Sequence, residues 1–169
     1  LLNEAWLRDY KFYVDERVII PRSLIAESLS ENLYPWIDDP ETIYSALDLC
    51  TGSGCLGIMM AHSFQNAAID LADLSDKALQ VAQINVDHYG LHDRIELIRS
   101  DLFNELKGKK YDLIISNPPY VNQASVNNFP MEFLKEPSMA LGSGDEGLDH
   151  TIRIIYEAKQ YLNDDGMLI

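Results

Sequence analysis

The fold is decided by residues 48–57, which read DLCTGSGCLG. A short apolar run precedes this stretch, and a pattern typical of a helix follows it. Gly52, Gly54 and Gly57 fit the spacing G-x-G-x-x-G, in which the first glycine takes the tight turn and the second lets a ligand approach the backbone closely. The stretch therefore predicts a strand, a turn and a helix that together hold a nucleoside cofactor, with a ligand-free tight turn as the alternative.

Strands and helices alternate along the rest of the chain. Ser75 and Gly90 are a plausible N-cap and a helix-ending residue for one of the helices. The predicted strands are 45–50, 68–73, 95–98, 111–116 and one that follows a turn at 163–166, and the predicted helices are 55–63, 75–89 and 148–161. Strands separated by crossover helices predict an α/β fold with a doubly wound, mostly parallel sheet. Because the chain begins without Met and stops inside a strand, we expect a fragment, truncated after the fifth strand.

The first forty residues follow a different pattern. Residues 12–14 and 18–20 flank a polar turn, which predicts a β-hairpin. Ser23 is a plausible N-cap for a helix that carries apolar residues from Leu24 to Leu33. We expect residues 1–40 to be a connecting segment left from a longer N-terminal region, and residues 41–169 to be the cofactor-binding core.

Composition narrows the function. The 13 Lys and Arg against 27 Asp and Glu give a formal charge of −14, which argues against the nucleic-acid backbone as a partner. No apolar run is long enough to span a membrane and no secretory signal is present, so we expect a cytoplasmic protein. Cys50 and Cys55 do not have zinc-knuckle spacing, and no metal site is expected.

Two acidic residues follow later strands and are candidates for binding the cofactor. Asp73, with Leu74 beside it, ends the second strand, where a carboxylate accepts hydrogen bonds from ribose hydroxyls. Asp101, with Leu102 beside it, follows the third strand, where its carboxylate is placed to accept from an adenine amino group. The alternative for Asp101 is a helix N-cap or turn residue.

The polar groups around the glycine turn favour one class of cofactor. A dinucleotide needs a helix N-terminus to hold its pyrophosphate. S-adenosylmethionine has no phosphate and needs a small turn with polar groups for its amino-acid tail. Asp48, Thr51 and Ser53 supply a carboxylate and two hydroxyls at this turn. We therefore favour S-adenosylmethionine, held by these residues together with Gly52 and Gly54.

The motif Asn117-Pro118-Pro119-Tyr120 ends the fourth predicted strand. Neither proline donates a backbone hydrogen bond, and their φ angles are fixed. The remaining rigid acceptors are the Asn117 side-chain oxygen and the Pro118 carbonyl, which match the two donors of a planar NH₂ group. Tyr120 can cover that planar group or lie near a sulfonium. We therefore assign these residues to catalysis and Asn117 also to the cofactor site, with a plain Pro-Pro turn as the alternative.

These motifs together carry a resemblance. The chain resembles the HemK-like protein-glutamine methyltransferases, a family of class I enzymes that use S-adenosylmethionine. The matching segments are residues 18–23, 48–57, Asp73, Asp101, 117–120, 136–137, 140–141 and 144–149. The resemblance implies a Rossmann-like fold and methylation of a glutamine side-chain amide in a protein substrate. Residues 21–27 look more like the branch that acts on a large-subunit ribosomal protein than like the release-factor branch, which is the alternative.

Rival functions stay open at this point. The same motif suits an adenine NH₂ in nucleic acid, the glycine pattern alone suits an NAD-dependent oxidoreductase, and a module with a vestigial pocket would bind only a partner. The long segment 121–147 is expected to be a functional loop, with a short helix at about 131–135. No histidine falls at a strand end beside the motif, so His62, His88, His92 and His150 are expected on the surface and no general base is assigned.

Overall fold

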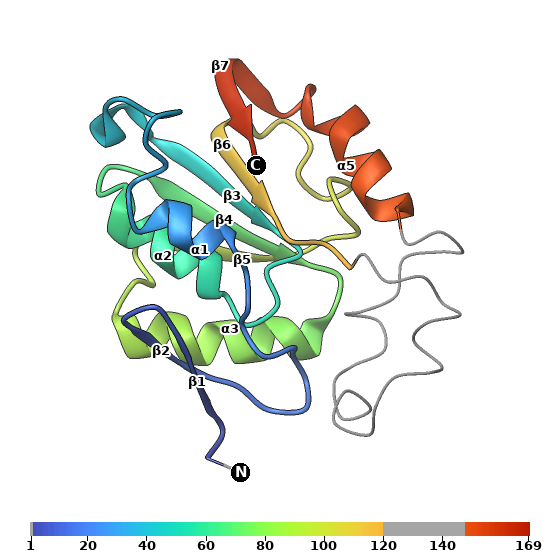
Figure 1. Cartoon of the computed structure of the whole chain (residues 1–169). Coiled ribbons are helices and arrows are strands. Elements are labelled where there is room, and N and C mark those ends of the chain that lie inside the picture. Colours follow the sequence, from blue (N-terminus) through green and yellow to red (C-terminus); the bar gives the residue numbers. More distant parts are fainter. Residues whose placement is uncertain (1, 120–147) are drawn as a thin grey trace.

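A parallel sheet of five strands forms the centre of the computed structural model, which describes residues 2–119 and 148–169 (Figure 1). The strands are β3 (Ser45–Leu49), β4 (Ala68–Asp73), β5 (Ile95–Arg99), β6 (Tyr111–Ser116) and β7 (Leu162–Leu168). Their order across the sheet is β5-β4-β3-β6-β7, and every neighbouring pair is parallel. The order reverses at β3, and in sheets of this kind ligands bind beyond the carboxyl ends of the strands at the reversal.

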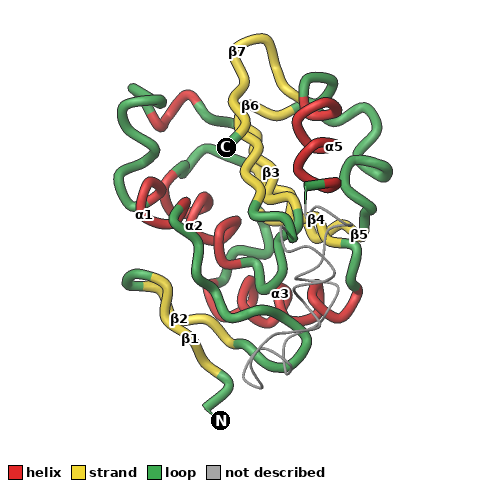
Figure 2. Tube along the Cα trace, turned by 45° about the vertical axis from the view of Figure 1, so that its right-hand side comes forward, coloured by secondary structure: helices red, strands yellow, loops and turns green. Residues whose placement is uncertain are grey.

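Helices cover both faces of the sheet, as a doubly wound fold requires. They are α1 (Ile25–Leu29), α2 (Cys55–Ser63), α3 (Asp76–Tyr89) and α5 (Asp149–Ala158), and a 3₁₀ turn, η1, spans Pro40–Thr42. Figures 1 and 2 show α1, α2 and α3 on one side of the sheet and α5 on the other. The predicted α/β fold with a doubly wound parallel sheet is thus confirmed.

Alternate residues of the strands point to opposite faces of the sheet and belong to two hydrophobic cores. Leu113 and Ile115 of β6 belong to the core beneath α2, whereas Ile114 between them belongs to the core beneath α5. This is the alternation expected of a strand that is buried on both faces. Burial on both sides fixes the register of the strand, and with it the direction in which the residues that follow it leave the sheet.

Local signals set the ends of α3 as predicted. The Ser75 hydroxyl accepts a hydrogen bond from the Ala78 amide at 3.2 Å, which caps the helix. Gly90 has a φ of +65°, the left-handed conformation that ends a helix. Because Ser75 comes two residues after the end of β4, the helix starts immediately beside the carboxyl edge of the sheet, where ligands bind in folds of this kind.

The predicted hairpin is at the wrong position. The antiparallel pair is β1 (Glu4–Leu7) with β2 (Tyr10–Tyr13), joined through Arg8, whose φ is +55°. Residues 14–20 are not a strand but an irregular segment. The polar residues 15–17 resemble a turn because they make one locally: both the backbone amide and the side chain of Arg17 donate to the Asp15 carboxylate.

Two other predictions are corrected in extent. Helix α1 ends at Leu29 and does not reach Leu33, because Asn32 and Leu33 have φ angles of +53° and +61°, which stop a helix. The predicted turn at residues 163–166 is an irregular part of β7, whose register with β6 shifts there. The expected loop 121–147 and the helix at 131–135 lie outside the described residues.

In the part of the chain that the structure describes, every helix is too short or too polar to cross a lipid bilayer. Residues of the N-terminal segment, including Phe12 and Leu29, pack in the same hydrophobic core as α2. The N-terminal forty residues therefore share packing with the sheet through buried apolar side chains.

Candidate functional site

The predicted cofactor and substrate motifs meet at one pocket. Leu49 at the end of β3 and Ser116 at the end of β6 are paired in register, so the glycine turn and the Asn117 motif leave the sheet side by side. The pocket has a volume of about 550 Å³, which is typical of small-molecule sites. Its described lining residues are Glu16, Arg17, Val18, Ile19, Leu49, Cys50, Gly52, Asp73, Leu74, Ser75, Lys77, Ala78, Gln80, Ser100, Asp101, Leu102, Asn117, Pro119 and His150.

The glycine turn is built from left-handed residues. Gly52 and Gly54 have φ angles of +58° and +81°, and Cys50 has a φ of +64° although it is not a glycine. A Cβ added at Gly52 would meet no atom within 4 Å, so this glycine leaves open space at the pocket. A Cβ at Gly57 would lie only 2.0 Å from Cδ2 of Leu71, so the third glycine allows α2 to pack closely on β4.

Asp48 points into the protein beneath this turn. Its carboxylate is buried and accepts hydrogen bonds from the Thr51 hydroxyl at 2.5 Å and from the Gly57 amide at 2.9 Å. Burial raises the pKa of the Asp48 carboxyl to about 7. Thr51 and Ser53 are buried as well, and neither they, Gly54 nor Asp48 belongs to the described lining of the pocket. Asp48 and Thr51 thus shape the turn from within.

Asp73 closes the opposite side of the turn. Its two carboxylate oxygens accept hydrogen bonds from the Gly52 and Ser75 amides, both at 2.9 Å. Burial raises the pKa of this carboxyl above its ordinary value. Leu74 beside it is exposed and lines the pocket. A carboxylate fixed by two backbone amides keeps lone pairs for a ligand and has a set orientation.

Asp101 lies at another wall of the same pocket. Its carboxylate pairs with the Arg153 guanidinium of α5 at 3.3 Å, and both side chains are partly exposed. Leu102 is buried with a φ of +49° and also lines the pocket. Asp73 and Asp101 are therefore brought to one cavity, and Asp101 pairs with Arg153, which the sequence did not single out.

The predicted catalytic motif, residues 117–120, follows β6 directly. Asn117 and Pro119 are half-buried and line the pocket, whereas Pro118 is half-buried but outside its described lining. Among the described residues, the Asn117 side chain has no hydrogen-bond partner, so its amide is available to a ligand. Tyr120 lies outside the described residues.

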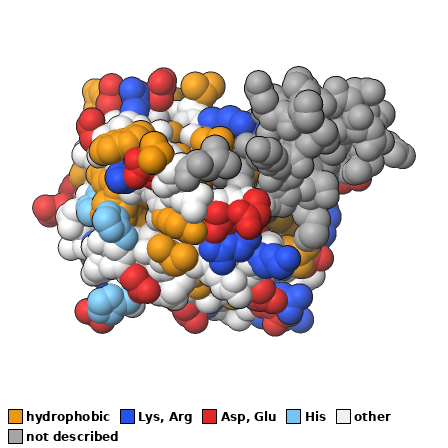
Figure 3. Space-filling model, turned by 90° about the horizontal axis from the view of Figure 1, so that it is seen from below, with side chains coloured by type: hydrophobic (Ala, Val, Ile, Leu, Met, Phe, Trp, Pro, Cys, Tyr) orange, Lys and Arg blue, Asp and Glu red, His pale blue; other side chains and the backbone are white. Residues whose placement is uncertain are grey.

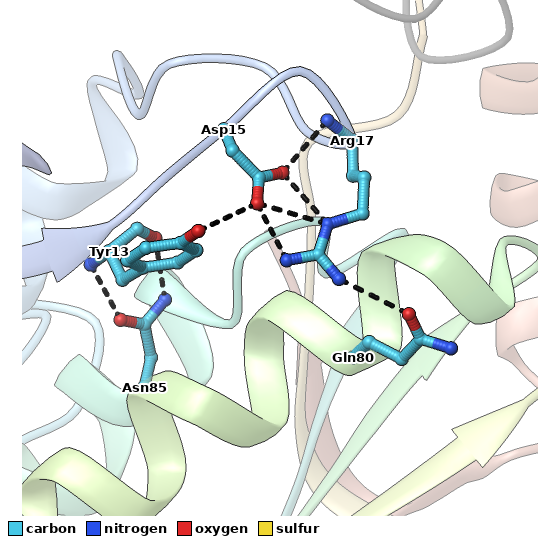
Figure 4. Close-up of polar contacts among 5 residues, drawn as sticks. All are labelled: Tyr13, Asp15, Arg17, Gln80 and Asn85. Atoms are coloured by element: carbon cyan, nitrogen blue, oxygen red, sulfur yellow. Dashed lines mark hydrogen bonds and ion pairs between the residues drawn. The ribbon is translucent and has the colours of Figure 1, made fainter. Parts of the chain in front are cut away.

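One wall of the pocket was missed by the sequence prediction. It consists of residues 16–19, which the predicted hairpin had assigned to a strand and its turn. Arg17 is fixed by the Asp15 carboxylate and donates to Gln80 of α3 at 3.2 Å (Figure 4). Hydrogen bonds from Arg17 lower the pKa of Asp15 to about 2. The only sequence signal of this ion pair was an acidic residue, Asp15, two positions before a basic one, Arg17.

Histidine positions differ from expectation at two of the four residues. His88 and His92 are exposed, as predicted. His150 at the start of α5 lines the pocket instead, and Nε2 of His62 is buried without a hydrogen-bond partner among the described residues. The helix that carries His150 follows the segment 121–147, so no strand end pointed to its position.

The surface chemistry agrees with the acidic composition. In Figure 3, acidic and basic side chains are interspersed over the visible described surface, which shows no continuous basic stripe. Within residues 2–119 and 148–169, no cluster of three His, Cys, Asp or Glu side chains is arranged to hold a metal ion. The described lining of the pocket presents carboxylates, cationic side chains, hydroxyls, amides and apolar groups to a ligand.

Comparison with known proteins identifies the family. A model of the methyltransferase small domain matches residues 27–148, which is most of the chain. The chain belongs to the methyltransferase small domain family. Two solved structures are similar in fold. The hMettl16 catalytic domain in complex with MAT2A 3'UTR hairpin 6 has a TM-score of 0.63 and 19% identity, over 89% of this chain and 58% of that one. A ribosomal protein L11 methylase from Lactobacillus delbrueckii subsp. bulgaricus has a TM-score of 0.59 and 18% identity, over 89% of this chain and 61% of that one. At this identity they support the fold alone.

Curated relatives in the family are much closer in sequence. Proteins named ribosomal protein uL3 glutamine methyltransferase are 54% identical in Neisseria gonorrhoeae, 56% in Neisseria meningitidis serogroup A and 50% in Francisella tularensis. Each match covers 100% of this chain. The chain spans little more than half of these relatives' own lengths, at 56%, 55% and 54% respectively.

Proposed function

We propose that this protein transfers a methyl group from S-adenosylmethionine to the side-chain amide nitrogen of a glutamine in a protein substrate. One observation carries the proposal: the glycine turn, two acidic strand ends and Asn117 with Pro119 line a single pocket. A cofactor site and an acceptor for NH₂ protons on one cavity are what methyl transfer to an amide requires. Membership of a methyltransferase family supports the same reaction.

The residues at the glycine turn fit S-adenosylmethionine better than a dinucleotide. In a dinucleotide site, free amides at the helix N-terminus bind the pyrophosphate. Here the amide of Gly57, in the first turn of α2, already donates to the buried Asp48 carboxylate. That amide is therefore not available to bind a phosphate, and a cofactor without phosphate does not need it. This contact argues against the NAD-dependent alternative.

Three parts of the pocket would hold the cofactor. Asp73 would accept from the ribose hydroxyls, Asp101 would accept from the adenine amino group, and the open side of Gly52 would leave room for the amino-acid tail. Leu74 and Leu102 would contact the apolar faces of the nucleoside. Cofactor binding would thus use residues from the ends of β3, β4 and β5.

Positioning does most of the chemical work in this mechanism. S-adenosylmethionine, when bound, supplies an electrophilic methyl group attached to a sulfonium. The Asn117 side-chain oxygen and the Pro118 carbonyl would accept the two protons of the glutamine NH₂, which directs the nitrogen lone pair out of conjugation and toward that methyl group. Tyr120 would fix the plane of the amide. Such near-attack positioning can lower the activation barrier by about 7–11 kcal/mol. Once the methyl group has moved from sulfur to nitrogen, the amide nitrogen would lose one of its protons to water.

The substrate we propose is a large-subunit ribosomal protein. The support is the name of the relatives, which are 50% to 56% identical over the whole chain. A ribosomal substrate also agrees with a cytoplasmic enzyme. In this proposal residues 1–40 are a connecting segment that packs beside the cofactor-binding core, residues 41–169.

The test replaces Asn117 with alanine in the full-length protein. Asn117→Ala should bind S-adenosylhomocysteine within about threefold of the wild type but lose at least about a hundredfold in methyl transfer, because an interaction made in the transition state is removed. Asn163→Ala is a matched control, since Asn163 bonds the Asp112 carboxylate outside the pocket. Unchanged transfer by Asn117→Ala would exclude the assigned role.

The acceptor is tested separately with a labelled methyl group. Purified ribosomal protein, release factor, ribosomal RNA and DNA are offered to the wild-type enzyme in parallel. Label on a glutamine of the ribosomal protein supports the proposal, and label on adenine would replace it with the nucleic-acid reaction. Calorimetry with NADH beside S-adenosylhomocysteine checks the cofactor.

A further inference from the structure

Asn85 of α3 joins two parts of the pocket wall that are far apart in the sequence. Its side chain is 1% exposed and makes three hydrogen bonds. Its oxygen accepts from the Tyr13 amide at 2.7 Å, and its nitrogen donates to the Tyr13 carbonyl at 3.0 Å and to the Ser53 carbonyl at 2.8 Å. One buried amide thus holds both the end of β2 and the glycine turn.

Tyr89 provides an internal comparison one helical turn further along α3. Its hydroxyl accepts from the Lys11 amide and donates to the Lys11 carbonyl, both at 2.9 Å. Tyr89 and Asn85 therefore hold alternate residues of β2 in the same manner. In the described structure, only Asn85 of these two also reaches the glycine turn.

Side-chain hydrogen bonds link Tyr13 to the missed pocket wall, residues 16–19. The Tyr13 hydroxyl donates to Asp15 at 2.9 Å, and Asp15 holds Arg17, which donates to Gln80 of α3 (Figure 4). Val18 is buried in one cluster with Ala78 and Val81 of α3. Residues 16–19 are thereby fixed over α3 from Tyr13 onward, at the same pocket as Gly52.

We propose that Asn85 is a positioning residue for cofactor binding, although it does not line the pocket. It sets the glycine turn and the 16–19 wall at one fixed separation, so that the cofactor meets a preformed cavity. This inference rests on the proposed function for the identity of the cofactor. Loss of the Asn85 amide would let the two walls move independently, and binding would have to order them again.

The first experiment compares Asn85→Ala with Tyr89→Phe in the full-length protein. Asn85→Ala should weaken S-adenosylhomocysteine binding by at least about tenfold, and should raise KM for S-adenosylmethionine while kcat at saturation stays within about twofold. Tyr89→Phe removes the two hydrogen bonds between the Tyr89 hydroxyl and the Lys11 backbone, which also join α3 to the hairpin. Its affinity for S-adenosylhomocysteine should stay within about twofold of the wild type. Equal loss of affinity in both variants, or a fall in kcat without a change in KM, would overturn the proposal.

The second experiment starts from the wild type, so its main comparison does not depend on the folding of Asn85→Ala. Amide hydrogen exchange is followed in the wild-type full-length protein with and without saturating S-adenosylhomocysteine. By linkage, binding should slow exchange at the Tyr13 amide by about tenfold and leave the Lys11 amide within about twofold. Equal changes at both amides would overturn the role of Asn85. Failure of the wild type to bind S-adenosylhomocysteine would instead overturn the proposed function. In that case the coupling between the two walls is tested without ligand: the rates of amide exchange at residues 13–19 and at residues 52–54 should both rise in Asn85→Ala, and a rise at only one of the two segments would overturn the role of Asn85.

Discussion

Leu49 and Ser116 lie opposite each other on neighbouring parallel strands, and the Ser116 hydroxyl donates to the Leu49 carbonyl at 2.7 Å. The two chain segments that follow them therefore start at the same level of the sheet. One is the glycine turn, and the other begins with Asn117. This pairing brings residues about 65 positions apart in the chain to one pocket, as crossover topology does at the carboxyl edge of a parallel sheet.

Asp73→Asn should weaken binding of S-adenosylhomocysteine by about tenfold to a hundredfold. The substitution removes the charge from an acceptor that we assign to the ribose hydroxyls, and hydrogen bonds to charged groups contribute about 1.5–3 kcal/mol. Isothermal calorimetry measures the affinity. Asp76→Asn is the control, because Asp76 is an exposed carboxylate three residues later whose partner is Arg99. An equal effect of both substitutions would show that general charge, not the site, is responsible.

Asp101 should discriminate the purine. S-inosylhomocysteine carries a carbonyl where S-adenosylhomocysteine carries the amino group, so this carbonyl and the Asp101 carboxylate would face each other as two acceptors. S-inosylhomocysteine should therefore bind the wild type at least about tenfold more weakly than S-adenosylhomocysteine. In Asp101→Ala the two compounds should bind within about threefold. Competition binding gives both ratios. Discrimination that survives in Asp101→Ala would assign adenine recognition to another residue.

Asp48→Asn should change the pH dependence of stability. The folded-state pKa of about 7 lies above the unfolded value of 3.8, so the contribution of Asp48 to stability is full below pH 3.8 and is lost as pH rises through about 7. The stability of Asp48→Asn relative to the wild type should therefore increase between about pH 5 and about pH 9, by a few kcal/mol because one pKa unit corresponds to about 1.4 kcal/mol. Urea unfolding across this range checks the direction, and a difference independent of pH would contradict it.

Gly57→Ala should destabilise the fold by about 1–3 kcal/mol through overpacking. The new methyl group would lie 2.0 Å from Cδ2 of Leu71, which is fully buried and cannot turn away into solvent. Leu71→Ala removes the clashing atom, so adding Gly57→Ala to that variant should cost less than adding it to the wild type. Urea unfolding of the four proteins completes the cycle. Additive losses would mean that the clash is relieved elsewhere.

The sequence predicted the central fold because its signals are local. Ser75 and Gly90 mark the ends of α3, and the glycine turn marks the junction of β3 with α2. The hairpin was misplaced because its true turn, at Arg8 and Asp9, contains no glycine or proline, whereas the acidic and basic pair at 15–17 looks like a turn. Its position depends on bonds to α3, which sequence periodicity does not reveal.

The candidate site was predicted at its strand ends and missed elsewhere. Asp73 ends a strand and Asp101 and Asn117 follow strands, and their common edge follows from the parallel topology of the sheet. The direction of the Asp48 side chain could not be predicted. The same local sequence allows this carboxylate to point into the pocket or toward the Gly57 amide, and the structure has the second arrangement. Residues 16–19 and His150 reach the pocket through tertiary packing alone.

The bonds from α3 to β2 have a further consequence for handling the protein. The outer edge of β2 carries the backbone groups of Lys11 and Tyr13, and the side chains of Tyr89 and Asn85 cover them. A strand edge without such cover is a template for pairing with another chain. Any condition that separates the hairpin from α3 will therefore expose the backbone groups of β2 for pairing with another chain, and intermolecular contacts in aggregates of this protein are expected at β2.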